Sequence, residues 1–417
     1  MASETKFKKT EIGMIPKEWE VQKLGEISVN LDNKRVPLSA KEREKMKGIY
    51  PYYGAQGIID HINDYIFDGI YLLVAEDGEN LKSHKEKIAT IAKGKFWVNN
   101  HAHIIFNNEK NDLKFLYYSI NTVRVSKYLT GSVQPKLNQK NLNRILIACP
   151  QLQEQKIITN ILSSFDDKID HNNQMNKTLE QIAQTLFKHW FIDFEFPDEN
   201  GNPYKASGGR MVDSELEEIP EGWKVKQIGD ICETFGGGTP KTSEPSYWED
   251  GDVFWATPTD MTSLNSPIIF DTSRKITVKG LQNSSAKLLP VGSILMTSRA
   301  TLGYFAISKV PISTNQGFIS MVCDDTTSKY YLLNSVQNKM DEIENLASGS
   351  TFLEINKTSF RSIRIILPPK SVIKKFDEIA DLIYEKIFQN ELETKRLAEV
   401  RDYLLPKLMS GKIRVEC

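Results

Sequence analysis

Residues 151–190 read QLQEQKIITNILSSFDDKIDHNNQMNKTLEQIAQTLFKHW, and this stretch decides the fold. Apolar residues recur from Ile157 to Leu186 at steps of three and four, which is the period of an amphipathic helix rather than of a strand. No Gly or Pro interrupts the stretch between Leu152 and Trp190. A helix of this length spans roughly 55 Å at about 1.5 Å per residue, and its length predicts packing against another long helix.

A second stretch, residues 370–411, repeats the first at an offset of 218. Two unrelated amphipathic helices are the alternative interpretation, but the duplication described next favours a repeat. We predict an antiparallel pair in which Asn172 and Asn390 lie near the crossing, because 172 + 218 = 390 and only mid-helix equivalents can meet about a two-fold axis. The residues expected to pair the helices are Ile161, Phe165, Ile169, Asn172, Leu179, Leu186, Ile383, Ile387, Asn390, Leu397 and Leu404.

The segments that open the two halves are also duplicated. Residues 11–27 read EIGMIPKEWEVQKLGEI and residues 215–231 read ELEEIPEGWKVKQIGDI, so that I-P-x-x-W occurs twice at an offset of 219 − 15 = 204. Two copies of such a motif indicate an internal repeat. The offset grows from 204 to 218 before the helices, so the second globular unit is 14 residues longer than the first.

The chain is too long for one ordinary core, so at least two domains are expected. We predict an α+β protein in which two mixed α/β domains, each followed by a long helix, are related by pseudo-two-fold symmetry and the helices form an antiparallel coiled coil. The predicted parts are a first domain at 1–150, a first helix at 151–190, a linker at 191–214, a second domain at 215–368 and a second helix at 369–411.

Each domain is rich in short segments typical of strands, with β-branched and aromatic residues between Gly, Asn and Asp. They predict a twisted, largely antiparallel sheet in each domain. Asn100-His101-Ala102 is expected to stand where Asn315-Gln316-Gly317 stands. The expected strands are 50–54, 69–75, 87–91 and 96–106 in the first domain, and 253–257, 293–297, 303–307 and 317–322 in the second.

Composition narrows the class of protein. The formal net charge is −1, so any nucleic-acid binding must rest on local basic patches. No apolar run reaches 18 residues, and MASETKFKKT lacks the apolar core of a secretory signal. The four cysteines, Cys149, Cys232, Cys323 and Cys417, are scattered without a CxxC pair, which indicates a reduced, cytoplasmic protein without a zinc site.

Several motifs together resemble one family. The two I-P-x-x-W openings, YPYYGAQGIID (50–60), GKFWVNNHAHIIF (94–106) and GSVQPKLNQKNLNRILIACPQLQEQKII (131–158) are similar to the specificity subunit of type I restriction–modification systems. The second half resembles the same family in the segments VFWATPTDM, GSILMTSRATLGYFAIS and STNQGF, and in the segment 365–369. The second helix start, LPPKSVIKKF, departs from it because it lacks the Glu154-Gln155 pair of the first.

The resemblance implies a function. The two domains would be target-recognition domains, each reading one half of a bipartite, asymmetric DNA site with an unread spacer, and the helices would set the spacing and bind methyltransferase subunits, two per chain. The family also implies ATP-dependent restriction (translocase–nuclease) subunits as partners and no cofactor on this chain, since S-adenosylmethionine, ATP and magnesium would bind those partners. Duplicated reading heads at fixed separation are how dimeric DNA-binding proteins address two half-sites.

Catalytic motifs are missing from the sequence. It has no G-x-x-x-x-G-K-[ST], no G-x-G-x-x-G after a strand, no [DN]-P-P-[YF] and no H-E-x-x-H. Gly236–Lys241 only looks similar to a phosphate-binding loop and is interpreted as a flexible loop. His101-x-His103 is interpreted as a surface pair rather than a metal site. We therefore predict a non-catalytic recognition subunit.

Candidate DNA contacts are loop residues with basic, amide or hydroxyl side chains, because Arg and Lys suit guanine edges and phosphates and Asn and Gln suit adenine edges. For each one the alternative is an ordinary solvated or turn-forming side chain. The run 34–47 has six basic residues and is either a phosphate contact or a solvated helix face. The candidates are Lys34, Arg35, Tyr53, Gln56, Asn80, Lys82, Asn100, His101 and Lys136 in the first domain, and Lys241, Thr242, Thr257, Arg299, Asn315 and Gln316 in the second.

Two other functions stay open. The chain could be a single-chain DNA methyltransferase or endonuclease, which S-adenosylmethionine binding by the isolated chain would indicate. It could instead be a coiled-coil scaffold whose globular units bind protein. A DNA titration separates these, since phosphate contacts give affinity a steep dependence on salt.

Overall fold

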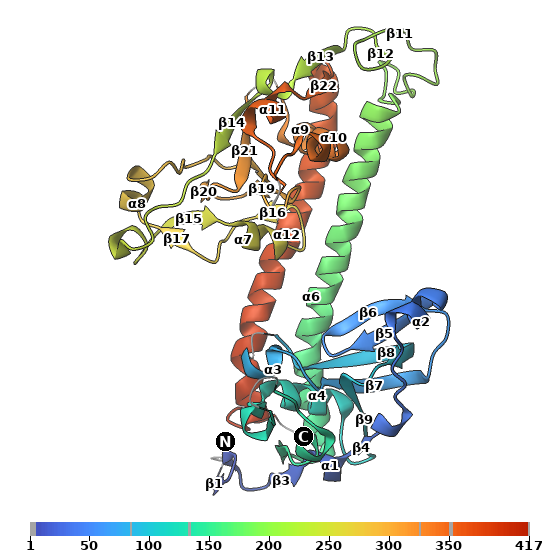
Figure 1. Ribbon diagram of the computed structural model, residues 1–417, viewed down its shortest axis with the longest axis vertical. Coiled ribbons are helices and arrows are strands. Elements are labelled where there is room, and N and C mark those ends of the chain that lie inside the picture. The colour runs from blue at the N-terminus through green and yellow to red at the C-terminus, as the bar shows by residue number, and fades with distance from the viewer. Residues whose placement is uncertain (1–5, 84–85, 132–134, 325–326, 350–352, 416–417) are drawn as a thin grey trace. The chain divides into compact units, whose positions relative to one another are not determined.

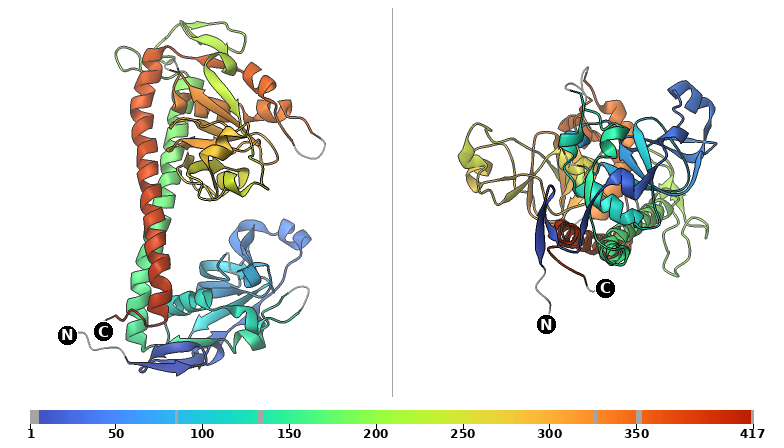
Figure 2. Two further views of the ribbon diagram at one scale, coloured as in Figure 1. Left: turned by 90° about the vertical axis from the view of Figure 1, so that its left-hand side faces the viewer. Right: turned by 90° about the horizontal axis from the view of Figure 1, so that it is seen from below.

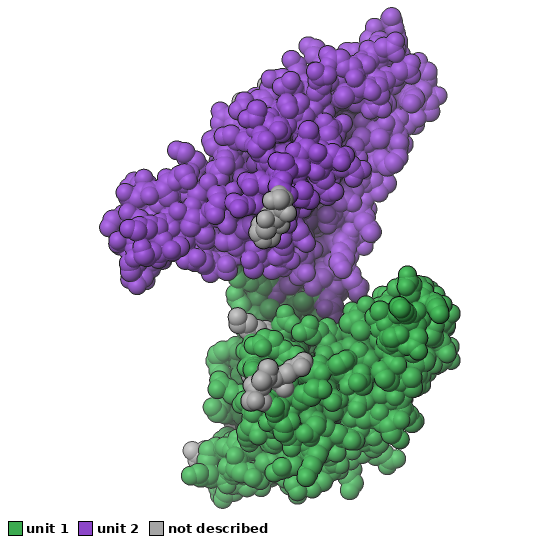
Figure 3. All heavy atoms as spheres, viewed as in Figure 1, with its two compact units in different colours: residues 1–169, 395–417 green, residues 170–394 purple. Residues whose placement is uncertain are grey.

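The chain divides into two compact units, drawn in different colours in Figure 3. Unit 1 comprises residues 1–169 and 395–417, and unit 2 comprises residues 170–394. The predicted fold class is confirmed, because each unit holds a mixed α/β region and each region is followed by a long helix (Figure 1). The computed structural model describes residues 6–83, 86–131, 135–324, 327–349 and 353–415.

Unit 1 is built on a six-stranded sheet in the order β4-β9-β7-β8-β5-β6. Neighbouring strands are antiparallel except β5 and β8, which are parallel. The predicted strand 96–106 is wrong, because a turn at Asn99–His101 divides it between two strands. The strands are β4 (Ser28–Asn30), β5 (Lys47–Gly54), β6 (Gly57–Ile62), β7 (Phe67–Ala75), β8 (Ala89–Val98) and β9 (Ala102–Asn107).

The smaller elements of unit 1 close its core. The strand that follows the first I-P-x-x-W motif, β3, pairs antiparallel with β10, which leads into the first long helix. Phe115 and Leu116 of α4 are fully buried in the same cluster as Leu72 of the sheet. These elements are β1 (Phe7–Thr10), β2 (Gly13–Pro16), β3 (Glu20–Lys23), α1 (Leu24–Ile27), α2 (Ala40–Lys45), α3 (Asn80–Ser83), α4 (Leu113–Thr122), α5 (Gln139–Leu142) and β10 (Leu146–Cys149).

Unit 2 is built on two larger sheets, ordered β14-β21-β18-β19-β16 and β17-β15-β20. The counterpart of the single long strand β8 is split here into β19 and β20, with Pro311 between them. Proline cannot donate to a strand ladder, which accounts for the break. The strands are β14 (Cys232–Gly236), β15 (Val253–Ala256), β16 (Ile268–Ile269), β17 (Lys275–Ile276), β18 (Ile294–Thr297), β19 (Phe305–Ser308), β20 (Ile312–Thr314) and β21 (Phe318–Cys323).

The remaining elements of unit 2 repeat the plan of unit 1. Strand β13 follows the second I-P-x-x-W motif and pairs antiparallel with β22, which leads into the second long helix. These elements are β11 (Met211–Val212), β12 (Ile219–Pro220), β13 (Lys224–Gln227), α7 (Pro258–Thr262), α8 (Val278–Gln282), α9 (Lys329–Gln337), α10 (Met340–Leu346), α11 (Lys357–Ser362) and β22 (Arg364–Leu367).

The long helices are α6 (Leu152–Phe187), which ends in a π-helical turn at Lys188–Ile192, and α12 (Lys370–Met409). Within each unit, the segments of the two helices lie side by side (Figures 1 and 2). In unit 2, Asn172 bonds Asn390 while Phe187 meets Phe376, so the chain directions are opposite. No helix in the described ranges is both long and apolar enough to cross a membrane.

Asn172 and Asn390 meet, as predicted, in the helix pair of unit 2. Both side chains are buried, and Nδ2 of Asn172 lies 3.4 Å from the carbonyl oxygen of Asn390. Nδ2 of Asn390 donates to Oδ1 of Asn176 at 2.8 Å, and Asn172 also donates to Glu393 at 2.9 Å. The seam therefore contains a polar cluster whose cross-helix hydrogen bonds form only when these positions face one another, although Oδ1 of Asn172 accepts no hydrogen bond from the described part of the chain.

The other predicted pairing residues lie along the same seam. In unit 2, Ile383 and Ile387 are buried in the core, with Leu179 and Leu186 packed against it. In unit 1, Ile161 and Leu404 pack against the core, and Nη1 of Arg401 bonds Oδ1 of Asp166 at 2.6 Å. The three remaining predicted residues, Phe165, Ile169 and Leu397, are half-buried.

The Glu154-Gln155 pair forms hydrogen bonds at the start of α6 that have no counterpart among the described residues at the start of α12. In unit 1, Glu154 accepts from the indole N–H of Trp19 at 3.0 Å and from Arg414 at 2.9 Å, and Gln155 bonds the backbone N–H of Asp112 at 3.0 Å. In unit 2 the position equivalent to Gln155 is Ile373, a buried apolar residue that can form no such side-chain hydrogen bond. The two helix starts are therefore held by different chemistry.

The stretch interpreted as a linker, 191–214, is partly packed into unit 2. Phe194 and Phe196 are buried, and their rings lie 5.6 Å and 5.0 Å from that of Trp223. Strand β11 pairs with β12. The stretch connects the two regions, but its aromatic residues cover Trp223 of the second I-P-x-x-W motif.

Candidate nucleic-acid interface

Three loops of unit 1 start from neighbouring strand ends. Strand β5 runs parallel to the end of β8, with Tyr53 opposite Val98. Because parallel strands end at the same edge, the turn at 54–57 and the turn at 99–101 lie next to each other. The third loop follows β4, and its Leu31 bonds the carbonyl of Ile104 in β9.

Unit 2 builds the same three loops. Strand β15 runs parallel to β20, with Ala256 opposite Thr314. Their ends lead into the loop at 257–259 and the turn at 315–317. The loop after β14 reaches the same edge, because the N–H of Gly238 donates to the carbonyl of Thr314 at 2.9 Å.

Corresponding hydrogen bonds fix the turn in both units. Asn99 donates its N–H to the carbonyl of Tyr53 at 3.0 Å, and its Oδ1 accepts from the N–H of His101 at 2.8 Å. The carbonyl of His101 accepts from the N–H of Glu76 at 2.9 Å.

In unit 2 the same roles fall to Asn315, whose N–H donates to Ala256 at 3.0 Å and whose Oδ1 accepts from Gly317 at 2.9 Å. The carbonyl of Gly317 accepts from the N–H of Ser298 at 2.8 Å. The predicted register is thus wrong by one residue: Asn99, not Asn100, corresponds to Asn315, because Asn99 forms the turn.

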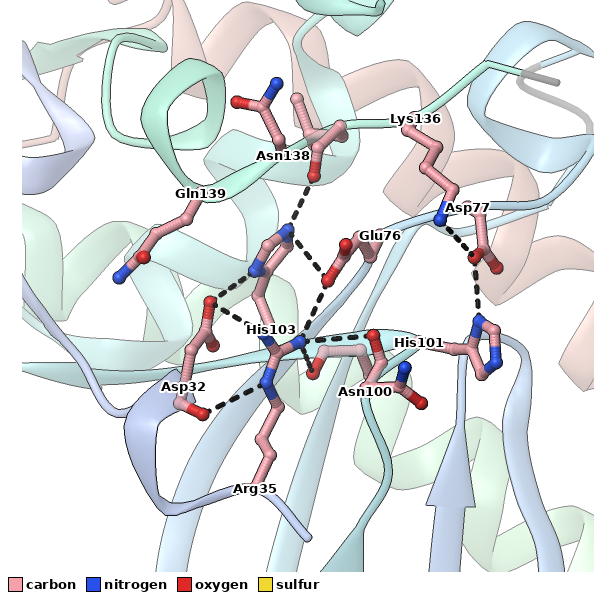
Figure 4. A network of polar contacts seen from close by, with 12 residues as sticks. Asp32, Arg35, Glu76, Asp77, Asn100, His101, His103, Lys136, Asn138 and Gln139 are labelled. Carbon is pink, nitrogen blue, oxygen red and sulfur yellow. Dashed lines mark hydrogen bonds and ion pairs between the residues drawn. The ribbon is translucent and has the colours of Figure 1, made fainter. Parts of the chain in front are cut away.

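A buried polar network supports the turn in unit 1 (Figure 4). The ring of His103 lies between Oδ2 of Asp32 and the carbonyl of Leu137, at 2.6 Å from each. Burial alone would raise the pKa of Asp32, but the hydrogen bond and charge of His103, the Ile104 N–H and Arg35 hold this pKa below its ordinary value. The interpretation of His101 and His103 as a surface pair is wrong for His103, which is 1% exposed.

Arg35 is part of this network rather than a free cation. Its Nη1 lies 2.9 Å from Oε2 of Glu76, 3.1 Å from the carbonyl of Ala102 and 3.3 Å from the carbonyl of Asn100. Its side chain is 16% exposed. Figure 4 shows it reaching from its own loop to the carbonyls of the turn, so it ties two of the three loops together.

A second, more exposed cluster lies beside it. Oδ2 of Asp77 is 2.7 Å from Nδ1 of His101 and 3.9 Å from Nζ of Lys136. The side chains of His101 and Lys136 are about half exposed, at 50% and 49%. Asp77 therefore orients two groups that can meet a phosphate or a base edge.

The glycine loop of unit 2 is held in place, which contradicts its interpretation as a flexible loop. A Cβ on Gly237 would lie 1.9 Å from the carbonyl oxygen of Asn315, and one on Gly238 would lie 2.2 Å from Oγ of Ser285. The indole N–H of Trp255 donates to the carbonyl of Gly238 at 2.9 Å. Glycine is required here for close backbone approach.

The predicted contact residues separate into three groups. Tyr53 and Asn80 are buried, so they belong to the core of unit 1; burial also raises the pKa of Tyr53. Arg35, Thr257 and Asn315 hold local structure, Thr257 as the cap of α7. The exposed candidates are Lys34, Gln56, Lys82, Asn100, His101, Lys136, Lys241, Thr242, Arg299 and Gln316.

Other basic residues prove to be structural or were missed. In the run 34–47, Arg43 and Lys47 bond Asp60, at 3.1 Å and 2.7 Å. Sequence reasoning missed Arg274, whose guanidinium lies 3.8 Å from the ring centroid of Trp248 beside the glycine loop. Its only sequence signal is a cation and an aromatic residue 26 positions apart, which no local pattern joins.

Within the described ranges, no group of three or more His, Cys, Asp or Glu side chains could hold a metal ion. The surface chemistry of the loops is instead that of amides, hydroxyls and cations on a fixed backbone. This chemistry suits the recognition of base edges and phosphates.

Comparison with known proteins agrees with this duplicated architecture. The family model for the type I restriction modification DNA specificity domain matches residues 16–181 and 220–402. The MjaIX specificity subunit of Methanocaldococcus jannaschii is 29% identical over 434 aligned residues, covering 99% of this chain and 98% of that protein. The HindI specificity subunit of Haemophilus influenzae is 32% identical, covering 67% of this chain and 71% of that protein.

A solved structure shares the fold. The crystal structure of the type I restriction–modification S subunit from M. genitalium aligns with a TM-score of 0.59 at 16% identity, covering 94% of this chain and 96% of that one. Since the family model matches both halves, this chain belongs to the family of type I restriction–modification specificity subunits.

Proposed function

We propose that this chain recognises a bipartite, asymmetric DNA site with an unread spacer and directs methyltransferase and restriction subunits to it, without a catalytic centre of its own. The observation that carries the proposal is that both units present the same three loops with different side chains. One backbone frame used twice would give two reading heads, and the different side chains would give different half-sites. Residues 1–150 would read one half-site and residues 215–368 the other.

The exposed groups support this function chemically. Asn100, Gln56 and Gln316 offer amides for base edges, while Lys136, Lys241 and Arg299 offer cations for phosphates. They stand on turns fixed by backbone hydrogen bonds, which is how a recognition site is preorganised. The net charge of −1 restricts the electrostatic contribution to such local groups.

The proposed partners are double-stranded DNA, two methyltransferase subunits and ATP-dependent restriction subunits, in the cytoplasm, with no cofactor bound to this chain. The named relatives are specificity subunits of type I restriction enzymes, which supports such an assembly. Exposed apolar residues on α12 support a protein-binding role for the helices, since Leu382 and Tyr403 are 74% and 63% exposed.

A domain exchange tests the division of labour. Residues 215–368 are replaced by the equivalent region of a relative, and methylated adenines are mapped in cells that express the hybrid with its methyltransferase partner. We expect one half-site to change and the other half-site to stay the same. A change in both half-sites would refute the assignment, and unchanged methylation would refute the role in recognition. Exchange of residues 1–150 is the reciprocal control.

A further inference from the structure

The tip residue of the repeated turn is an amide in both units. Asn100 follows Asn99, and Gln316 follows Asn315, so the hydrogen-bonded frame makes Asn100 and Gln316 equivalent. Both residues are exposed. Asn99 and Asn315 are explained by the turn that they form, but the frame itself uses only the backbone at the tip. The hydrogen bonds of the turn therefore do not explain why both units have an amide side chain at the tip.

The residue that supports the tip is also equivalent in the two units. Arg35 and Thr239 are related by the offset of the opening repeat, 239 − 35 = 204. Arg35 donates to the backbone carbonyl of Asn100 at 3.3 Å, and Oγ1 of Thr239 donates to Oε1 of Gln316 at 2.5 Å. One loop thus positions the tip in each unit, through the backbone in unit 1 and through the amide itself in unit 2.

An amide has a particular base partner. Its oxygen can accept from N6 of adenine while its NH₂ donates to N7, a bidentate pair that other bases do not match. The bond from Thr239 occupies one lone pair of the Gln316 oxygen and leaves the second lone pair and the NH₂ group for a base.

We propose that Asn100 and Gln316 each read one adenine, one in each half-site, and that Arg35 and Thr239 are positioning residues for them. This inference rests on the proposed function and specifies it: the two half-sites differ overall but each contains an A·T pair at the equivalent place. His101 and Gly317, which follow the tips, differ between the units and leave neighbouring bases free to differ.

The test is selection of bound sequences from a randomised double-stranded DNA library by the full chain. We expect Asn100→Ala to remove the preference for A·T at one position of one half-site, and Gln316→Ala to do so in the other half-site. The preference lost should be about tenfold or more, the usual discrimination of a bidentate contact. Exposed amides on other elements give matched controls, Asn63→Ala in unit 1 and Gln227→Ala in unit 2, which should leave the selected sequence unchanged.

A modified base tests the contact directly. A probe with 7-deazaadenine at the assigned position lacks the N7 acceptor, so it should weaken binding by the wild-type chain but not by the Asn100→Ala variant. Thr239→Val should relax the same position as Gln316→Ala, whereas Thr239→Ser, which keeps the hydroxyl, should restore it. Arg35→Met should resemble Asn100→Ala, and circular dichroism checks that it is folded.

The outcomes separate the two proposals. If the wild-type chain selects no sequence, the proposed function fails and the adenine contacts fail with it. If it selects a bipartite sequence but the tip variants relax no A·T position, only the adenine inference is overturned. Relaxation of a G·C position, or of both half-sites by one variant, also overturns it.

Discussion

Lys136 in unit 1 and Glu354 in unit 2 occupy equivalent positions but carry opposite charges. Each closes a bridge to the start of its loop, Thr130 with Lys136 and Ser348 with Glu354, at the common offset of 218. Each also faces a residue of opposite sign after the central strand, Asp77 in unit 1 and Arg299 in unit 2. Both units therefore place one cation at this site, but unit 1 supplies it from the segment that leads to α5 and unit 2 from the segment that follows β18.

The opposite arrangement of charges in the two units predicts that the Arg299–Glu354 ion pair can be exchanged for one with the acidic and basic residues swapped. The Arg299–Glu354 pair is about half exposed, at 51% and 45%, so it contributes at most about 1 kcal/mol. Glu354→Lys alone should lower the urea midpoint slightly, because it opposes Arg299. Adding Arg299→Glu should restore the midpoint and recreate the arrangement of unit 1.

The same variants bear on DNA binding. If Arg299 contacts a phosphate, Arg299→Glu should reduce the slope of log affinity against log salt by about 1. The double exchange should return the slope to its wild-type value, since it supplies a cation at the same place. An unchanged slope in all variants would show that this cation does not contact DNA.

The buried asparagine cluster predicts an unequal response to two kinds of substitution. Asn390→Ala leaves the Asn176 oxygen without its donor, and an unsatisfied buried polar group costs about 1–3 kcal/mol. Replacing Asn176 and Asn390 together by Leu removes the orphaned oxygen along with its donor and keeps the bond from Asn172 to Glu393, so it should recover part of that loss, at the expense of register. Urea unfolding followed by circular dichroism measures both, and equal losses in the two variants would contradict the role of hydrogen bonding.

The polar network of unit 1 predicts a stability that depends on pH. The pKa of Asp32 is lowered on folding, so its carboxylate stabilises unit 1 above the unfolded value of about 3.9, and this contribution disappears as pH falls through the folded-state pKa. Asp32→Asn should lower the free energy of unfolding near pH 7, and its difference from wild type should shrink below about pH 4. Exposed Glu109→Gln is the control; a constant difference across this range would refute the linkage.

The buried thiols predict chemical inertness. Burial of Cys149 and Cys232, and partial burial of Cys323, raises the pKa of each thiol to about 12, so almost no thiolate forms near neutral pH. Iodoacetamide should label these residues slowly in the native protein and quickly in urea, as measured by peptide mass spectrometry. Cys417 lies outside the described residues, so the prediction does not extend to it. Rapid native labelling of Cys232 would show that β14 opens.

Local periodicity made the helices and the duplication predictable, since Ile157 to Leu186 and its repeat carry their pattern in consecutive residues. The turn register was not predictable, because Asn99 and Asn100 are both asparagines and only the carbonyl of Tyr53 decides which one forms the turn. The role of Arg35 depends on carbonyls more than sixty positions away. A basic loop residue therefore looks the same in sequence whether it faces DNA or the protein interior.

Unit 1 is made of two segments that are far apart in the order of synthesis. Ile158 and Leu162 share a buried cluster with Leu408, and Glu154 bonds Arg414. Residues 170–394, which form unit 2, leave the ribosome between them and take roughly 10 to 50 s at about 5–20 residues per second. Unit 1 therefore begins to emerge first but is completed last. Part of its apolar surface stays uncovered until residues 395–417 are synthesised, whereas all residues of unit 2 are already present by then.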